Sequence, residues 1–379
     1  MKIAITADLH LNPKYPERGL AFQDILRQLD AEGIPELVIA GDLFDKDGDD
    51  SAYASFLEPC RAHPSIRIHL IPGNHDSEQS LKNLALESLQ KYQEPKLVNF
   101  DGLGVFFVPY RKSKAMGEMI NLGQGNEREG KPWVLVGHGD FVDGLREPNP
   151  REKGIYMPLR RSDLNDVNLK QAFLGHIHKP TSIDMPLGGK VIYPGSPQGL
   201  DISETGHRRF LVLDTKDNKV SERRISSGTI YLDLNFFVFP SDQEAEELLG
   251  QLEKSLADAA WESERERFQL RLRVEGFTRN KDQLIAIFTE RLQSLHLNLY
   301  ESSNSTGRVN PNFDSLLSAS DPQRNLVARR TIEKIDLFFE SSEQEVGEDK
   351  PGSFLGTLGD QEPTIEKVKM AALRTIYQV

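Results

Sequence analysis

The chain has 379 residues, of which 38% are hydrophobic and 27% charged, and its formal net charge is −12. This length suits two or more domains, and this composition is typical of a globular protein with a sizeable core. No apolar run approaches the roughly 20 residues that span a bilayer, which excludes a membrane partner, and the first run is interrupted at Asp8 too soon for a secretory signal.

Cysteine content and charge distribution narrow the class of protein further. The single cysteine, Cys60, has no partner for an internal disulfide, which predicts a reducing, cytoplasmic location. Residues 1–228 carry 29 Lys and Arg against 32 Asp and Glu, whereas residues 229–379 carry 17 against 26. The net acidity argues against a simple electrostatic nucleic-acid binder, and it is concentrated in the C-terminal part.

The N-terminal part alternates between predicted strands and helices. Apolar runs predict buried strands at 2–7, 36–42 and 66–71, and helical periodicity predicts helices at 18–33, 51–61 and 78–90. From about residue 103 the pattern becomes strand-rich, with runs at 103–110, 133–138, 171–178, 190–196, 208–215 and 219–226. These elements predict an α/β fold with two mixed sheets and helices outside, a four-layer αββα sandwich over residues 1–228.

Residues 229–300 predict a small α/β capping domain. The segment TIYLDLNFFVF alternates with period two, SDQE (241–244) matches a capping box, and Asn280 suits a helix start. A strand at LHLNLY would complete a β-α-β-α-β unit. Residues 301–379 predict polar linkers around helices at about 321–339 and 363–378, the latter with a stripe of Ile365, Val368, Ala372 and Ile376.

Polar residues capable of binding metal follow several of the predicted strands. The segments are DLH (8–10), GDLFD (41–45), PGNHD (72–76), VGHGD (136–140), LGHIH (174–178) and YPGSPQG (193–199). In open α/β sheets ligands bind where strands end, so these loops are expected to lie together. Carboxylates, imidazoles and one amide oxygen suit a pair of borderline divalent metals such as manganese, iron or zinc, with Asp42 as the natural bridge.

In this order the motifs resemble the signature of calcineurin-like metallophosphoesterases, over about residues 1–225. The resemblance implies that Asp8, His10 and His178 hold a first metal, that Asp42 bridges, and that Asn74, His138 and His176 hold a second. It further implies that His75 is the catalytic histidine and that Asp45 holds its ring. The implied cofactor is two divalent ions, most often Mn²⁺, with Fe²⁺, Zn²⁺ or Mg²⁺ as alternatives.

Two features indicate the subfamily. GDLFD and PGNHD lack the arginines with which protein phosphatases of this superfamily bind a phosphomonoester, which favours a diester or another substrate. The segment from GHIHKP to FLVLD is similar to bacterial SbcD-type DNA-repair exonucleases, YhaO-like members included. That resemblance implies cleavage of DNA in a homodimer, with C-terminal helices that bind an SbcC-like ABC ATPase with a coiled coil.

Sequence support for DNA contacts is weaker than that for the metal site. Arg267, Arg271 and Arg273 share one face of a predicted strand and are candidates for phosphate contacts, as are Arg111 and Lys112. A solvated sheet face with salt bridges is the favoured explanation of this strand. Two other classes stay open: a phosphoesterase acting on a nucleotide or other small phosphoester, and a non-catalytic scaffold with a structural metal site.

Overall fold

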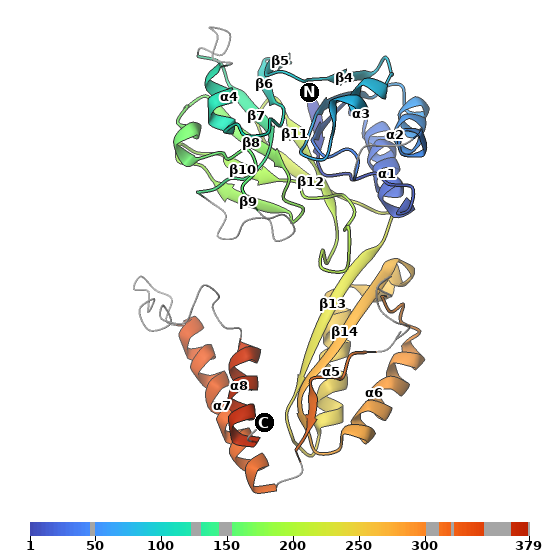
Figure 1. The fold of residues 1–379 in the computed structure, drawn as a ribbon, viewed down its shortest axis with the longest axis vertical. Coiled ribbons are helices and arrows are strands. Elements are labelled where there is room, and N and C mark those ends of the chain that lie inside the picture. Colours follow the sequence, from blue (N-terminus) through green and yellow to red (C-terminus); the bar gives the residue numbers. More distant parts are fainter. Residues whose placement is uncertain are drawn as a thin grey trace. The chain divides into compact units, whose positions relative to one another are not determined.

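The computed structural model describes residues 1–45, 50–122, 130–143, 154–300, 311–319, 322–344 and 365–377. The chain divides into two compact units, Met1–Tyr231 and Leu232–Val379, each with its own sheets and helices (Figure 1). Within the described ranges, every helix is too short or too polar to cross a membrane.

Two six-stranded sheets form the first unit. The first sheet contains, in spatial order, β12 (Val220–Arg224), β11 (Arg209–Asp214), β1 (Lys2–Thr6), β2 (Glu36–Ala40), β3 (Arg67–Ile71) and β4 (Leu89–Lys91). The second contains β5 (Lys96–Phe100), β6 (Leu103–Val108), β7 (Trp133–His138), β8 (Leu169–Gly175), β10 (Lys190–Tyr193) and β9 (Thr181–Asp184). Strands β1 to β4 run parallel, as do β6, β7, β8 and β10, so each sheet gathers the carboxyl ends of its parallel strands at one edge.

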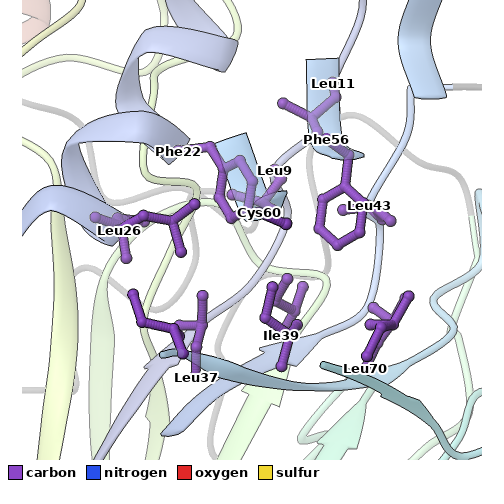
Figure 2. Packing of buried hydrophobic residues seen from close by; sticks show 14 of the residues in the cluster. Leu9, Leu11, Phe22, Leu26, Leu37, Ile39, Leu43, Phe56, Cys60 and Leu70 are labelled. Carbon is purple, nitrogen blue, oxygen red and sulfur yellow. The ribbon is translucent and has the colours of Figure 1, made fainter. Parts of the chain in front are cut away.

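The period-two alternation of β2 builds two different cores. Leu37 and Ile39 face outward, where α1 (Pro16–Glu32) and α2 (Asp50–Ala62) cover them. Figure 2 shows Phe22 and Phe56, from these two helices, on this face of the sheet. Val38 and Ala40 face the opposite way and pack with residues of β6 and β7 from the second sheet. Because successive side chains of a strand point to opposite faces, one apolar strand serves both cores.

The second sheet is covered on its outer face. Phe106 and Leu135 pack there with Met116 and Ile120 of α4 (Met116–Leu122), close to the short 3₁₀ helix η1 (Arg161–Leu164). The predicted four-layer αββα sandwich is therefore confirmed: helices, sheet, sheet, helix.

One predicted helix of the first unit is too long. The helix expected over 78–90 ends early, as α3 (Glu78–Asn83), and the chain then forms strand β4 beside β3. The ammonium of Lys91 donates to the main-chain oxygens of Leu81 and Leu84, which fixes this reversal. Pairing with β3 outweighs the helical propensity of the segment.

The second unit has a three-stranded sheet in the order β13 (Ile230–Val238), β14 (Phe268–Thr278) and β15 (Leu316–Ser318). Its helices are α5 (Glu244–Asp258), the 3₁₀ helix η2 (Trp261–Arg267), α6 (Lys281–Leu295), α7 (Pro322–Gln344) and α8 (Ile365–Tyr377). The predicted cap at Asn280 is confirmed, because its side chain accepts from the amide of Gln283. Much of the predicted linker sequence, at 301–310 and 345–353, lies outside the described residues.

Three details of the prediction for this unit are wrong. The capping box does not form, because Glu244 accepts from the hydroxyl of Thr278 at the end of β14 instead of capping its own helix. The segment 295–300 makes only an isolated bridge, Leu270 to Leu299, and β15 takes the third place in the sheet. The face of α8 that packs on Phe277 is centred on Met370, Leu373 and Tyr377, and Ile376 of the predicted stripe packs against the same cluster, partly buried.

Candidate metal centre

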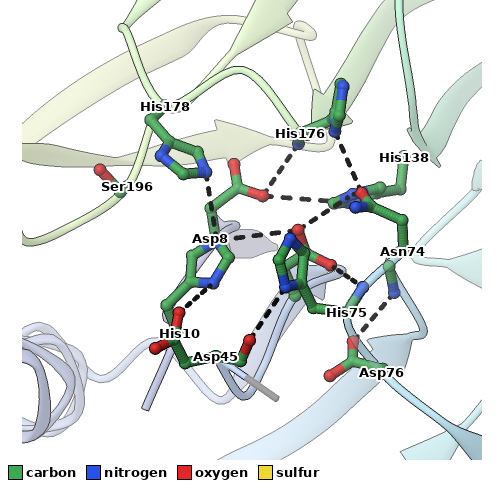
Figure 3. A network of polar contacts seen from close by, with 12 residues as sticks. Asp8, His10, Asp45, Asn74, His75, Asp76, His138, His176, His178 and Ser196 are labelled. Atoms are coloured by element: carbon green, nitrogen blue, oxygen red, sulfur yellow. Dashed lines mark hydrogen bonds and ion pairs between the residues drawn. The ribbon is translucent and has the colours of Figure 1, made fainter. Parts of the chain in front are cut away.

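The predicted metal ligands lie together at the carboxyl ends of the parallel strands. They come from the segments that follow β1, β2, β3 and β8 and from the last residue of β7. Figure 3 labels all of them except Asp42 and shows the labelled side chains directed toward one another. The residues are Asp8, His10, Asp42, Asn74, His138, His176 and His178. The structure thus brings all of them together from both sheets.

A first group of three side chains comprises Asp8, His10 and His178, whose ligand atoms all lie within 4.8 Å of one another. The Nε2 atoms of His10 and His178 are 3.1 Å apart. Asp8 and His10 are buried, while the side chain of His178 is 12% exposed. The group is therefore buried except at the partly exposed His178.

A second group comprises Asp42, His138 and His176, to which Asn74 is added by geometry. Oδ1 of Asn74 lies 2.9 Å from Nε2 of His138 and 3.1 Å from Nδ1 of His176. Oδ2 of Asp42 lies 3.4 Å from Nε2 of His138 and 3.7 Å from Nε2 of His10, a member of the first group. Asp42 stands between the two groups, where a bridging carboxylate is needed.

The donor atoms fit divalent cations. Oδ2 of Asp8 is buried and receives no hydrogen bond from any described residue. Nδ1 of His138 donates to the main-chain oxygen of Ala40 at 2.9 Å, which leaves the Nε2 lone pair directed at the second group. A buried carboxylate oxygen without a donor and an imidazole in a fixed tautomer are the arrangement of a metal site with its ligands pre-oriented.

The electrostatics favour positive charge at this place. Burial raises the pKa of Asp8 above its ordinary value. Burial also works against ionisation of Asp42, but the imidazoles of His138 and His10 outweigh it and hold the pKa of Asp42 far below its usual range. Burial likewise opposes a charged His138, yet the Asp42 and Asp8 carboxylates raise its pKa to about 10. The field that holds a proton on this imidazole is the field that a divalent cation would experience.

The backbone at the ligands is strained. Four of them adopt left-handed φ values, namely Asp8 (54°), His10 (45°), Asp42 (52°) and His176 (94°). For residues with a Cβ this conformation costs about 1–2 kcal/mol each. Such strain persists only where surrounding structure enforces it, and it is concentrated at functional sites.

Three glycines make room for the ligands. A Cβ on Gly41 would lie 2.2 Å from Nδ1 of His138, one on Gly73 would lie 2.1 Å from Oδ1 of Asp42, and one on Gly175 would lie 2.0 Å from the main-chain oxygen of Ala40. These distances are far below van der Waals contact. The glycines that precede Asp42, Asn74 and His176 are therefore packing requirements of the centre.

His75 lies beside the first group, and Asp45 serves it differently from the prediction. The rings of His75 and His10 are 5.0 Å apart, edge to face. Nδ1 of His75 donates to the main-chain oxygen of Asp45 at 2.9 Å. The carboxylate of Asp45 lies 3.6 Å from Nδ1 of His10 and from Arg18, and it accepts from Asn12. The His10 imidazole, followed by the Arg18 charge, lowers the pKa of Asp45 well below its usual range.

The predicted DNA-contacting residues have acidic partners. Arg271 and Arg273 both pair with Asp233 of β13, and Arg267 pairs with Glu264. These contacts match the salt-bridged sheet face that the sequence also allowed.

The other two candidates lie in the first unit. Arg111 pairs with Glu94 and donates to the main-chain oxygen of Gln93, while Lys112 is exposed. Since the Arg111 head is already paired, Lys112 is the more accessible cation of the two.

Sequence reasoning missed several residues that support the ligands. The carboxylate of Asp76 accepts from the amides of Gly73, Leu43 and Phe44, and so joins the second and third motif loops. Buried Arg18 donates to the main-chain oxygen of His10. Asp76 is the last residue of the GNHD motif, and this position could have identified it as part of the site. Arg18 lies in a helix whose sequence pattern indicated only packing.

A comparison with family models matches residues 1–180 to the calcineurin-like phosphoesterases. Just under half of the chain is thus similar to this family. The match contains every predicted ligand of both groups and indicates a metal-dependent hydrolase. The family implies a dinuclear metal site, for which the two groups supply candidate ligands.

Among curated relatives, this phosphoesterase is 26% identical over 270 residues to a Rhodobacter capsulatus protein named as the D subunit of the nuclease SbcCD, an alignment that covers 56% of this chain and 66% of that one. Solved structures similar to it include a Thermus thermophilus protein (TM-score 0.40, 14% identity, 59% of this chain and 98% of that chain). A purple acid phosphatase from yellow lupin is similar with a TM-score of 0.43 and 12% identity, over 61% of this chain and 52% of that chain. A dimetal phosphatase from Danio rerio is similar with a TM-score of 0.43 and 13% identity, over 59% of this chain and 95% of that chain.

Proposed function

We propose that this protein is a two-metal-dependent phosphodiesterase that cleaves DNA and works as the nuclease subunit of a DNA-repair complex with an SbcC-like ABC ATPase. The observation that carries the proposal is the convergence of two ligand groups around the Asp42 carboxylate within a phosphoesterase domain. Two cations bridged by one carboxylate clamp a phosphoryl centre and supply Lewis-acid chemistry. We expect manganese, and a set of imidazole and oxygen donors also accepts Fe²⁺, Zn²⁺ or Mg²⁺.

The residues of the chain take distinct roles in this proposal. The two groups around Asp42 would hold one cation each and thereby orient the scissile phosphate. His75 is anchored through Nδ1 by a main-chain oxygen, which leaves Nε2 to deliver a proton to the leaving oxygen. The partial exposure of His178 and His75 marks the side from which substrate would enter.

A diester substrate is favoured over a monoester. The segments GDLFDKD and PGNHD have no arginine that could grip a phosphate dianion bidentately. The Rhodobacter capsulatus relative is named as part of a nuclease, which points to the phosphodiester of DNA. The phosphodiester class therefore rests on two independent observations.

A protein partner is part of the proposal. Helix α7 exposes Leu337 and Phe338, each at 64%, an apolar pair suited to docking another chain. The relative's name implies a second subunit, which we take to be an ABC ATPase with a coiled coil. A homodimer and a cytoplasmic location complete the proposal, the latter because the one cysteine, Cys60, is buried as a free thiol.

The decisive experiment is a nuclease assay of the full chain with Mn²⁺ on single-stranded, blunt duplex and hairpin DNA, with His75→Ala as the matched inactive control. Parallel assays use bis-p-nitrophenyl phosphate and p-nitrophenyl phosphate. Cleavage of DNA that disappears in the control supports the proposal. Turnover of the small esters without DNA cleavage would replace it with a small-molecule phosphoesterase.

A further inference from the structure

The loop between β10 and β11 closes on His178 from two sides. The amide of Ser196 donates to the main-chain oxygen of His178 at 3.1 Å, and Nη1 of Arg208 donates to the same oxygen at 2.8 Å. On the side-chain end, Nδ1 of His178 lies 2.7 Å from Oε1 of Glu204. One loop thus fixes both the backbone and the imidazole of this ligand, and Figure 3 shows Ser196 beside it.

Glu204 is itself held firmly. Its Oε2 atom accepts from the hydroxyl of Ser196 at 3.0 Å and from the amide of Leu200 at 2.8 Å, and it lies 3.4 Å from Arg208. The side chains of Ser196, Glu204 and Arg208 are all buried, and Glu204 is 8% exposed. A buried carboxylate with this many donors has one orientation, and that orientation points Oε1 at His178.

Two glycines permit this arrangement. A Cβ on Gly195 would lie 2.6 Å from the main-chain oxygen of His178, and a Cβ on Gly199 would lie 2.7 Å from the main-chain oxygen of Glu204. The PGSPQG sequence therefore lets the loop fold tightly over the ligand and the carboxylate. The loop is built around the contact between Glu204 and His178.

We propose that Glu204 is a positioning residue of the first metal group, which keeps the proton of His178 on Nδ1 and directs its Nε2 lone pair at the cation held by Asp8 and His10. The inference rests on the metal centre of the proposed function. A carboxylate behind a ligating histidine fixes the tautomer and raises the basicity of the ligand. Its loss costs roughly 10- to 100-fold in metal affinity or activity.

The second group uses a different device. One of its two histidines, His138, is oriented by the main-chain oxygen of Ala40, at 2.9 Å, which no side-chain substitution removes. A change at Glu204 should therefore weaken the binding of the cation at the first group and leave the binding of the cation at the second group unchanged. This asymmetry separates a positioning role from a general loss of stability.

The test measures Mn²⁺ binding to the purified full chain by calorimetry and by electron paramagnetic resonance. Glu204→Gln keeps the shape of the side chain and an oxygen acceptor but removes its charge. We expect one site of unchanged affinity, a second weakened roughly 10-fold or more, and loss of the spin-coupled Mn²⁺ pair at low metal. Ser196→Ala, which removes one of the bonds that hold Glu204, should show a smaller shift of the same site.

Glu36→Gln is the matched control. Glu36 is a second buried carboxylate paired with a histidine, with Oε2 at 2.9 Å from Nε2 of His69, but it lies outside the metal centre. This variant should lower the Tm of the metal-free protein and leave both Mn²⁺ affinities unchanged. A loss of Mn²⁺ affinity in Glu36→Gln equal to that in Glu204→Gln would overturn the positioning role.

Two further outcomes separate the claims. Wild-type affinity at both sites in Glu204→Gln and Ser196→Ala, beside a wild type that binds two Mn²⁺, would overturn only the role of Glu204. A wild type that binds no Mn²⁺ would overturn the metal centre and this role together. If Glu204→Gln does not fold, the binding curve of Ser196→Ala decides.

Discussion

Nδ1 of His75 donates to the main-chain carbonyl of Asp45 across 2.9 Å. Because a carbonyl oxygen only accepts, this contact places the proton on Nδ1 and leaves Nε2 for chemistry. The anchor belongs to the backbone of Asp45, so it survives substitution of that side chain. The roles of the two residues can therefore be separated by experiment.

Replacing His75 by Ala should keep both metals and lose turnover. No ligand is removed, and the loss of a positioned proton donor costs roughly 10²- to 10⁴-fold in kcat. Metal content by elemental analysis and kcat on bis-p-nitrophenyl phosphate measure the two effects. Release of a metal ion from this variant would make His75 a ligand instead.

Asp45→Asn tests the reassignment of that carboxylate. Since Oδ1 of Asp45 lies 3.6 Å from Nδ1 of His10, we expect weaker Mn²⁺ binding, by several-fold, with kcat at saturating metal close to wild type. Titration of activity with Mn²⁺ measures the Mn²⁺ affinity and the kcat at saturating metal separately. If Asp45→Asn keeps the wild-type Mn²⁺ requirement but has a kcat as low as that of His75→Ala, the Asp45 carboxylate acts through His75, as the sequence predicted, and not through His10.

Asp42→Ala should abolish binding of both cations together. The Asp42 carboxylate lies between the groups and also accepts from the amide of His75 at 2.9 Å, so its loss disturbs ligands and the catalytic histidine alike. We expect no measurable hydrolysis and no spin-coupled Mn²⁺ signal. Retention of one tightly bound Mn²⁺ would show that Asp42 is terminal and not bridging.

Removing metal should lower thermal stability. A ligand at 100 times its Kd stabilises the folded state by about 2.7 kcal/mol, which is roughly 5–10 °C in Tm for a domain of this size. Scanning calorimetry of chelated and Mn²⁺-loaded protein gives the shift, and Asp42→Ala serves as the variant that should not respond. Equal Tm values for the two wild-type samples would argue against a cation at this place.

The pair Leu337→Asp with Phe338→Asp should weaken association with the ATPase partner. Both side chains are 64% exposed on α7, away from the Ala328 and Ile332 positions that pack into the core of the second unit. Pull-down with the ATPase measures the loss, and hydrolysis of bis-p-nitrophenyl phosphate should not change. Lys334→Glu on the same helix controls for charge, and unchanged capture of the ATPase by the double variant would exclude this surface.

The sequence predicted the sandwich and the meeting of the candidate ligands for one physical reason, whereas the role of each ligand came from the resemblance to calcineurin-like metallophosphoesterases. Metal ligands that directly follow short buried strands are positioned by the sheets, so their order along the chain already implies that they meet. Asp8 and His178 are distant in sequence and follow strands of different sheets, β1 and β8, yet their ligand atoms lie within 4.8 Å of each other.

What the sequence could not supply were contacts set by the folded surroundings. The hydrogen bond from Arg18 to His10 and the pair of Glu204 with His178 join a helix or a loop to a ligand without any periodic signal. Similarly, strand β4 replaces the end of a predicted helix because β3 offers it an edge. Side-chain partners and strand ends depend on neighbours that local pattern does not encode.

The glycines at 41, 73 and 175 set a condition for anyone who would rebuild this centre in another scaffold. Each occupies a point where even a methyl group would collide with a ligand or with the carbonyl that orients one. Grafting only the carboxylates and imidazoles onto a new pair of sheets would reproduce the donors without the space in which they meet. A metal centre moved to another scaffold must therefore include these glycines as well as the metal ligands.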